Sequence, residues 1–321
     1  MDFKNHLKRI LTGLSIPQEY ICIDLRDFQN PLSVFLAIGN QDFLLNVTSS
    51  HLFLGYKPLN IGLSFNISDE NYTSIRDQRN IAFHFVSEPQ TEIAKLILRR
   101  IGERVIGNQV VLFYEGEHGS HSFLKHFHQW ISRLFEKLRT HPANNVSLQG
   151  NLIEQVRIAY SIPRIISVIS ASDGSLINMF PTDLHGQIGE KYYAGSLRKG
   201  GLANEQIEKC KRIVISEVGA SFYRQAYALG KNHMKQLQNE SIFSIHPSRS
   251  KNFNFPLPIL ARYYRELKWI DSFDHGIHRI HLYEIIYQQA VEEGKSTLAH
   301  IHQHYAQWRI DRKLKTNYLF R

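Results

Sequence analysis

The order of apolar and polar positions predicts a chain built mostly of short β-strands. In the second half, residues 165–171 are rich in β-branched side chains and end at the turn Ser172-Asp173-Gly174, after which residues 175–180 resume a strand pattern. Two short apolar runs joined by a tight turn are typical of a β-hairpin. The same half predicts strands over 191–198, 212–218 and 277–286 and a helix over 202–210.

The first half carries strand patterns in the same order. They cover residues 31–38, 43–47, 59–65, 80–86 and 109–115, with a short polar helix before the fourth. Residues 121–140 predict a longer helix, and the matching residues 299–314 predict a weaker one. The longer helix would have one apolar face, formed by Phe123, Phe127, Ile131, Leu134, Phe135 and Leu138.

Similar blocks recur in the same order in both halves, which indicates an internal duplication. The first block places Ser64 on Ser196, an offset of 132 residues, and the second places Gly107 on Gly276, an offset of 169. A third block matches residues 122–129 to 296–303, pairing histidines with histidines. The second copy therefore contains about 37 extra residues between the first two blocks.

The duplication predicts two domains, 1–145 and 146–321, divided near the polar stretch 141–151, with an insertion in the second at about 232–270. Each unit is expected to be a small antiparallel barrel with one or two helices. The fold class is therefore predicted to be α+β, mainly β, with two tandem barrels. The insertion is rich in proline, aromatic and basic residues, which suggests an ordered loop or lid over a site.

Composition narrows the function. The 321 residues include 43% hydrophobic and 21% charged residues, as in an ordinary globular protein. Two cysteines, Cys22 and Cys210, exclude a disulfide scaffold and a cysteine-cluster metal site. No signal peptide and no run of about 18 apolar residues is present, so a cytoplasmic protein without membrane contact is expected.

The net charge of +9 points to an anionic partner, either nucleic acid, a phosphorylated cofactor or an acidic surface. Because the basic residues are scattered, a solvated basic surface is the plainer interpretation, and nucleic-acid binding rests on charge alone. His300 and His304 have a spacing that can bind metal, but copy one has Trp130 at the matching place and no carboxylate–histidine motif accompanies them. No metal site is predicted.

The segment from Arg164 to about Ile286 resembles the flavin reductase-like branch of the FMN-binding split barrels. The features that carry the resemblance, by their order and spacing, are Asn178-Met179 on the second strand, Arg198-Lys199 at a strand end, and Gly276-Ile277-His278 before a strand that contains Glu284-Ile285. Where family members often have Thr-x-Ser, this chain has Phe180-Pro181-Thr182-Asp183. The resemblance implies a Greek-key split barrel that binds FMN at the interface with a second barrel. Two barrels in one chain would then form an internal pseudo-dimer, which could pair further as a homodimer.

The resemblance also implies roles for individual residues. Ser196, Arg198 and Lys199, followed by Gly200, would bind the flavin phosphate, since Arg can direct two donors at phosphate oxygens. His278 would act as the catalytic residue, donating to reduced flavin or moving a proton. The full predicted cofactor-binding set is Asn178, Met179, Phe180, Pro181, Thr182, Asp183, Ser196, Leu197, Arg198, Lys199, Gly200 and His278.

Plainer interpretations of these residues stay open: a solvated strand end, a buried strand with a proline bend, and a partly buried strand histidine. Copy one has Gln109 in place of His278 and Asn66-Ile67 in place of Arg198-Lys199, so it is expected to be degenerate. The leading hypothesis is an NAD(P)H-dependent oxidoreductase that holds FMN or FAD, with the nicotinamide nucleotide bound transiently. The alternative is a flavin-binding or scaffold protein without turnover.

Overall fold

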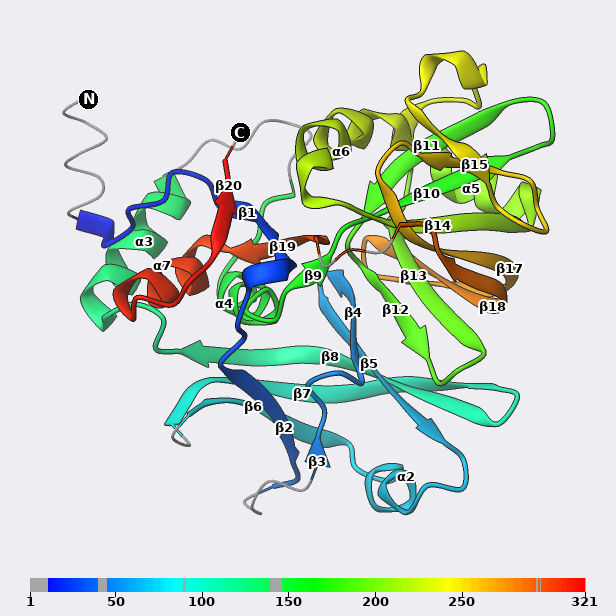
Figure 1. Cartoon of the computed structure of the whole chain (residues 1–321). Helices are drawn as coiled ribbons and strands as arrows, with labels where there is room; N and C mark the ends of the chain where they lie inside the picture. Colours follow the sequence, from blue (N-terminus) through cyan, green and yellow to red (C-terminus); the bar gives the residue numbers. More distant parts are fainter. Residues whose placement is uncertain are drawn as a thin grey trace.

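The chain is mainly β in the computed structural model, which describes residues 11–39, 45–88, 91–138, 146–292, 294 and 296–320. Two seven-stranded antiparallel sheets lie against each other, and a four-stranded sheet lies beside both (Figure 1). The predicted mainly β class is therefore confirmed, and the predicted strands over 191–198, 212–218 and 277–286 and the helix over 202–210 are present.

The first sheet has the strand order β3-β2-β6-β7-β8-β5-β4. Its strands are β2 (Leu32–Ala37), β3 (Leu45–Asn46), β4 (His51–Tyr56), β5 (Leu59–Asn66), β6 (Asn80–Ser87), β7 (Thr91–Ile106) and β8 (Gln109–His121). A single short helix, α2 (Glu70–Ile75), connects β5 to β6, and Asp69 caps it by accepting a hydrogen bond from the backbone N–H of Asn71.

The second sheet has the strand order β11-β10-β14-β17-β18-β13-β12. Its strands are β10 (Ser167–Ser172), β11 (Ile177–Thr182), β12 (His185–Ile188), β13 (Tyr192–Arg198), β14 (Arg212–Val218), β17 (Ala261–His275) and β18 (His278–Ala290). Helix α5 (Leu202–Cys210) connects β13 to β14 as α2 connects β5 to β6.

The two sheets therefore list their strands in the same order, and equivalent strands also pair in equivalent register. Ser64 pairs with Val111 across β5 and β8, and Ser196 pairs with Ile280 across β13 and β18. These pairs are related by the offsets of 132 and 169 residues found in the sequence. The pairs β6–β7 and β14–β17 obey the same offsets, with Ile81 opposite Leu98 and Ile213 opposite Leu267.

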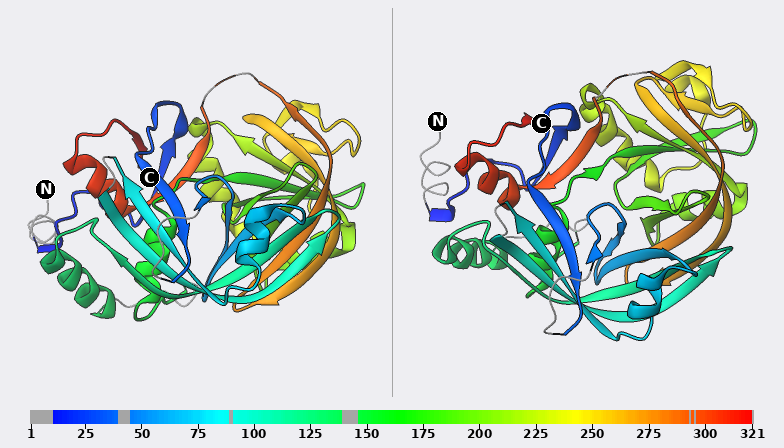
Figure 2. Two further views of the ribbon diagram at one scale, coloured as in Figure 1. Left: turned by 90° about the horizontal axis from the view of Figure 1, so that it is seen from below. Right: turned by 60° about the horizontal axis from the view of Figure 1, so that its bottom comes forward.

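The four-stranded sheet joins the two ends of the chain, in the order β20-β1-β19-β9 (Figure 2). Its strands are β1 (Tyr20–Asp24), β9 (Arg164–Ile165), β19 (Leu298–His302) and β20 (Asn317–Leu319). Three helices accompany it: α3 (His126–Leu138), α4 (Leu152–Ala159) and α7 (Gln303–Asp311). Val156 of α4 and Trp308 of α7 belong to the same buried cluster as the first sheet, so this core includes elements from beyond residue 145.

The two seven-stranded sheets meet through matching turns. The N–H of Ile277 donates to the carbonyl of Lys57 at 3.1 Å. Gly276, before it, has φ +54° and lies so close that an added Cβ would be 2.2 Å from that carbonyl oxygen. Gly107, its counterpart at the offset of 169, has φ +59° and packs equally closely on the Tyr192 hydroxyl. Both positions favour glycine because φ is positive, and Gly276 also has no room for a side chain because its close neighbour is backbone.

Three sequence predictions differ from the structure in detail. The segment inserted between β14 and β17 spans 219–260, so residues 261–270 of the expected insertion belong to β17. The weaker helix expected over 299–314 is a strand up to His302, and α7 begins at Gln303. The longer helix expected over 121–140 begins only at His126, so Phe123, which is buried, precedes it, whereas Phe127 and Leu134 on α3 are 60% and 43% exposed.

The inserted segment contains short helices and a two-stranded ribbon. They are η2 (Ala220–Phe222), α6 (Tyr223–Leu229), η3 (Gly230–Met234), η4 (Glu240–Ile242), β15 (Ile245–Arg249) and β16 (Pro256–Pro258). The segment is attached to the edge strand β11, where Ile177 and Gln238 exchange two backbone hydrogen bonds at 2.9 and 2.7 Å. An edge strand has unpaired backbone groups, and the insertion covers them here.

Candidate functional site

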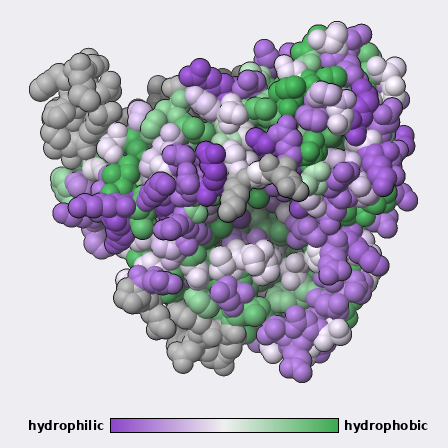
Figure 3. All heavy atoms as spheres, in the orientation of Figure 1, coloured by the Kyte–Doolittle hydropathy of each residue, from purple (hydrophilic) through white to green (hydrophobic). Residues whose placement is uncertain are grey.

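A polar recess lies where the two seven-stranded sheets and the four-stranded sheet meet. Asp183 follows β11, His300 is on β19, and Tyr56 ends β4. The Asp183 and His300 side chains are 20% and 16% exposed, and the surrounding protein strongly desolvates both, an effect that opposes the net pKa shift of each. Side chains that are partly exposed and strongly desolvated border a recess, and Figure 3 shows the molecule hollowed near the centre of this face.

Asp183 and His300 form the charged pair of the recess. The His300 Nδ1–H donates to Asp183 Oδ2 at 2.9 Å, and the Tyr160 hydroxyl donates to the same oxygen at 3.0 Å. Burial alone would lower the pKa of His300, but the hydrogen bond and charge of Asp183, with a further contribution from Cys22, outweigh it and raise this pKa to about 9. The pKa of Asp183 is lowered, because the bonds from His300 and Tyr160 outweigh its desolvation. The carboxylate is therefore compensated by an imidazolium.

The pair continues away from the recess through Tyr227 of α6. The other nitrogen of His300, Nε2, lies 3.0 Å from the Tyr227 hydroxyl. The buried thiol of Cys22 on β1 donates to that hydroxyl at 3.5 Å. A connected series of polar groups thus runs from Asp183 through His300 and Tyr227 to Cys22 on β1. Tyr160 and Tyr227 had no pattern in the sequence that would assign them to a site, and His300 was considered only for its metal-binding spacing with His304.

His278 lies between the two seven-stranded sheets. It is 1% exposed, its Nδ1 lies 3.2 Å from Ser196 Oγ, and its ring packs edge-on against Tyr56 at 4.6 Å. Desolvation, assisted by the charge of Arg198, lowers its pKa to about 4, so the imidazole is neutral at pH 7. Its Nε2 is buried and has no hydrogen-bond partner among the residues that the structure describes.

The structure brings Ser196 and His278 into contact and leaves the expected phosphate ligands at the surface. Arg198, Lys199 and Gly200 are exposed at the end of β13, and Gly200 has φ +82°. Lys199 Nζ lies 3.7 Å from a carboxylate oxygen of Asp274. This end of β13 therefore offers two cations on a glycine turn before α5.

The expected ring-lining residues of β11 point in several directions. Phe180 is fully buried in the core of the second sheet, with Leu197 of β13, and Met179 points to the opposite face. The Asn178 amide donates to Gln206 Oε1 and to the Asn232 carbonyl, both at 2.9 Å. These four side chains are committed to packing. Thr182, 8% exposed, donates weakly to the Ser196 carbonyl at 3.5 Å.

The insertion also covers the backbone edge of β11 beside the recess. Asn232 Nδ2 donates to the Met179 carbonyl at 2.9 Å, and His233 Nε2 lies 2.9 Å from the Pro181 carbonyl oxygen. Burial lowers the pKa of His233, so this ring is neutral and donates that hydrogen. The carbonyl groups of Met179 and Pro181 on this strand therefore already accept hydrogen bonds from the insertion.

The corresponding positions of the first half contain no cation. Asn66 pairs with Gln109 across β5 and β8, at the places of Arg198 and His278. Gln109 packs against Gly189: a Cβ added to Gly189 would lie 2.7 Å from the side-chain amide carbon of Gln109. The first half provides Tyr56 to the recess.

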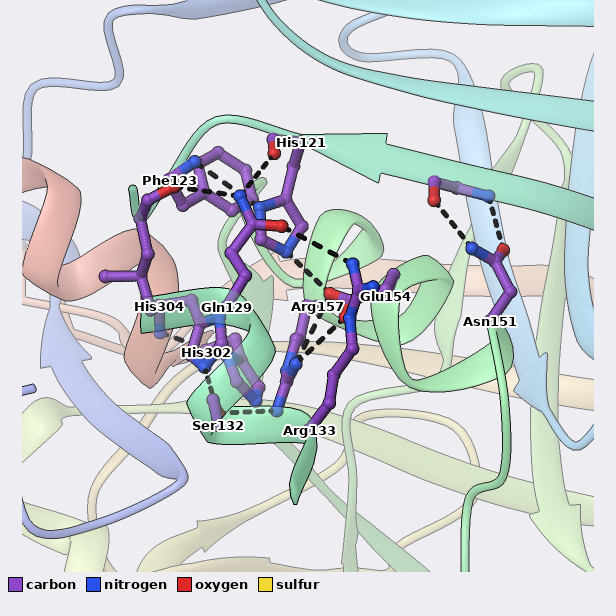
Figure 4. Close-up of polar contacts among 12 residues, drawn as sticks. His121, Phe123, Gln129, Ser132, Arg133, Asn151, Glu154, Arg157, His302 and His304 are labelled. Carbon is purple, nitrogen blue, oxygen red and sulfur yellow. Dashed lines mark hydrogen bonds and ion pairs between the residues drawn. The ribbon is translucent and has the colours of Figure 1, made fainter. Parts of the chain in front are cut away.

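A second polar centre lies among α3, α4 and α7 (Figure 4). Glu154 Oε2 accepts from His121 Nε2 at 2.7 Å, and Oε1 accepts from Arg133 Nε at 2.6 Å. The Arg157 guanidinium lies 3.3 Å from both oxygens and donates to Ser132 Oγ at 3.3 Å. The side chains of Glu154 and Arg157 are 3% and 4% exposed. This buried ion pair joins α3 and α4 to the end of β8.

Within the described ranges, no group of three or more His, Cys, Asp or Glu side chains is arranged to hold a metal ion. His300 and His304 do not converge, because His300 binds Asp183 on one side and His304 faces Ser132 on the other. None of the described helices is long and apolar enough to cross a membrane.

No protein-family model and no curated protein sequence matches the chain. Solved structures similar to it are flavin reductases and FMN-binding proteins. The Streptomyces globisporus C-1027 NADH:FAD oxidoreductase SgcE6 is 14% identical, over 49% of this chain and 94% of its own, with a TM-score of 0.41. An FMN-binding protein from Thermus thermophilus with bound p-hydroxybenzaldehyde is 15% identical, over 48% and 82%, with a TM-score of 0.38. A homologue of nitrilotriacetate monooxygenase component B from Mycobacterium thermoresistibile is 12% identical, over 53% and 89%, with a TM-score of 0.39.

Proposed function

We propose that this chain is a flavin-binding oxidoreductase of the flavin reductase type, with FMN or FAD held in the recess between the two seven-stranded sheets. The observation that carries the proposal is His278. The imidazole of His278 is buried and neutral. One of its nitrogens contacts Ser196, and the other has no partner among the described residues. We expect a ligand to bind this nitrogen, because leaving a buried polar atom unpaired destabilises the fold by about 1–3 kcal/mol.

We further propose that the two sheets are tandem split barrels, duplicates of one unit in domains 1–145 and 146–321, which pair as an internal pseudo-dimer. The equal strand order and the registers related by the offsets of 132 and 169 support this. The matching close approaches at Gly107 and Gly276 support a pseudo-twofold relation, since a twofold interface uses equivalent surfaces on both units.

The residues present fit a flavin phosphate and a proton-transfer group. Arg198 and Lys199 would bind the phosphate, and His278 would hold or move a proton at Nε2. The positive charge of the His300 imidazolium compensates the negative charge of Asp183, which would otherwise repel an anionic cofactor. A bound flavin would supply the hydride and electron chemistry, with NAD(P)H as its transient donor.

A second candidate is a non-catalytic scaffold that no longer binds flavin. It is favoured by the insertion, because Asn232 and His233 already occupy the carbonyl groups of Met179 and Pro181 on the strand that would face the ring. The scaffold candidate predicts a folded protein without flavin affinity.

Titration of the purified protein with FMN and FAD, followed by visible absorption and flavin fluorescence, separates the two candidates. We expect saturable binding that weakens about tenfold or more in the Arg198→Ala/Lys199→Ala variant, since two charge-assisted phosphate bonds are lost. Lys191→Ala, which removes an exposed lysine of the same half, is the control.

His278→Asn tests the proton-transfer role. It is expected to lower NAD(P)H turnover more than it lowers flavin affinity. Absence of flavin binding to the wild-type protein would reject the oxidoreductase proposal and leave the scaffold.

A further inference from the structure

The inserted segment encloses a second cavity of about 260 Å³ that is distinct from the recess. Its walls come from β11, α6 and the short helices η2 to η4 of the insertion. Six of its lining residues define its chemistry: Met179, Phe222, Leu229, Lys231, Lys235 and Phe243. None of them belongs to the polar network of Asp183 and His300.

The floor of this cavity is apolar. Met179, Phe222 and Phe243 are 1%, 2% and 9% exposed and belong to one hydrophobic cluster under the insertion. A ligand tail placed against them would be removed from water, which favours binding in proportion to the apolar surface of the tail that is buried. The volume lies just below the usual range of small-molecule sites, about 300–1,000 Å³, which favours a short chain over a full-length lipid.

The rim of the cavity is cationic. Lys231 and Lys235 both line it, together with the neutral polar residues Gln225, Asn232 and Ser244, and no Asp or Glu is among its lining residues. Neither ammonium group has an ion-pair partner in the part of the chain that the structure describes. An apolar floor with two unpaired lysines at its rim matches a molecule that has an apolar body and one anionic end.

We propose that this cavity binds an amphipathic monocarboxylate of medium chain length, with its tail on Met179, Phe222 and Phe243 and its carboxylate beside Lys231 and Lys235. The inference does not rest on flavin binding, because the flavin proposal depends on His278, Arg198 and Lys199, and none of these lines the cavity.

Methionine labelling provides a direct test. The chain has three methionines, so protein labelled with methyl-¹³C methionine gives few signals, and Met179→Leu identifies the one in the cavity floor. We expect decanoate, at pH 8 and below its micelle concentration, to shift the Met179 signal saturably. Decanol and decyltrimethylammonium, which have the same tail, are expected to bind more weakly.

Lysine variants test the carboxylate assignment. Lys231→Gln and Lys235→Gln are each expected to weaken decanoate about threefold, as for partly exposed ion pairs, and to leave decanol unchanged. Lys191→Gln is the matched control, and Ala228→Phe, on the exposed wall of the cavity, should block all three ligands.

Two results would overturn the proposal. One is a Met179 signal that decanoate does not shift saturably. The other is equal affinity for decanoate and decanol that the lysine variants leave unaltered. Both readouts are independent of flavin, so failure here is distinguishable from failure of the proposed function.

Discussion

Replacing Glu154 by glutamine is expected to destabilise the protein by about 3–5 kcal/mol, because it leaves a buried arginine without a counter-charge. Glutamine keeps the shape of Glu154 and can still accept the hydrogen bond from His121. It cannot compensate Arg157, whose side chain is 4% exposed and whose nearest anion is Glu154, 3.3 Å away. Arg133 is 52% exposed and remains solvated, so the cost comes from Arg157.

Urea unfolding, followed by tryptophan fluorescence and far-ultraviolet circular dichroism, measures this loss. With a slope of about 3 kcal/mol per M, the midpoint should fall by about 1 M or more. Glu117→Gln is the control, since Glu117 and Arg99 are 41% and 38% exposed and their pair is worth about 1 kcal/mol or less. Glu154→Gln/Arg157→Met should recover most of the loss, because it removes both charges.

The reasoning is refuted if Glu154→Gln loses less than about 1 kcal/mol with an unchanged slope. It is also refuted if the double variant is no more stable than Glu154→Gln alone. The first outcome would mean that Arg157 reaches water without Glu154, and the second that the cost lies in the shape of the site rather than in its charge.

Three further predictions concern the contacts between elements. Gly276→Ala should lower the free energy of unfolding in urea more than Gly200→Ala does. Both glycines have positive φ, but only at Gly276 would the added Cβ collide with Lys57. Equal losses of stability would contradict this close contact. His300→Gln should lower the free energy of unfolding most below pH 6.5, by at most about 3 kcal/mol according to the pKa shift of His300. The loss should shrink as the pH rises towards 9, because a raised pKa stabilises the folded state only while the imidazole is protonated. A loss that grows with pH would refute the ion pair. Asn151→Ala should lower the free energy of unfolding, measured in the same way, by about 1–2 kcal/mol, because it removes two hydrogen bonds to Gly119 at 2.6 and 2.8 Å. An unchanged stability would show that these bonds are not needed to keep α4 in place.

The sequence by itself determined the local elements and their correspondence. Alternating apolar positions identified most strands of both sheets, because one side of each strand faces a core. The offsets of 132 and 169 residues agree with the observed registers of β5–β8 and β13–β18, since register follows the same apolar pattern. Ser196 and His278 were both named as site residues from the sequence, and the pairing of β13 with β18 brings them into contact.

Only the tertiary structure decided what borders the recess and where the insertion lies. Asp183, Tyr160 and His300 come from three elements whose meeting depends on the packing of β19 beside β1, and no local pattern encodes it. The exposed apolar face of α3 shows the same limit, because periodicity predicts which side chains share a face and not whether another element covers it. Contacts between residues far apart in sequence depend on how the whole core packs. The apolar pattern of a strand or helix specifies which of its own side chains face the core, and not which residues of other elements they contact.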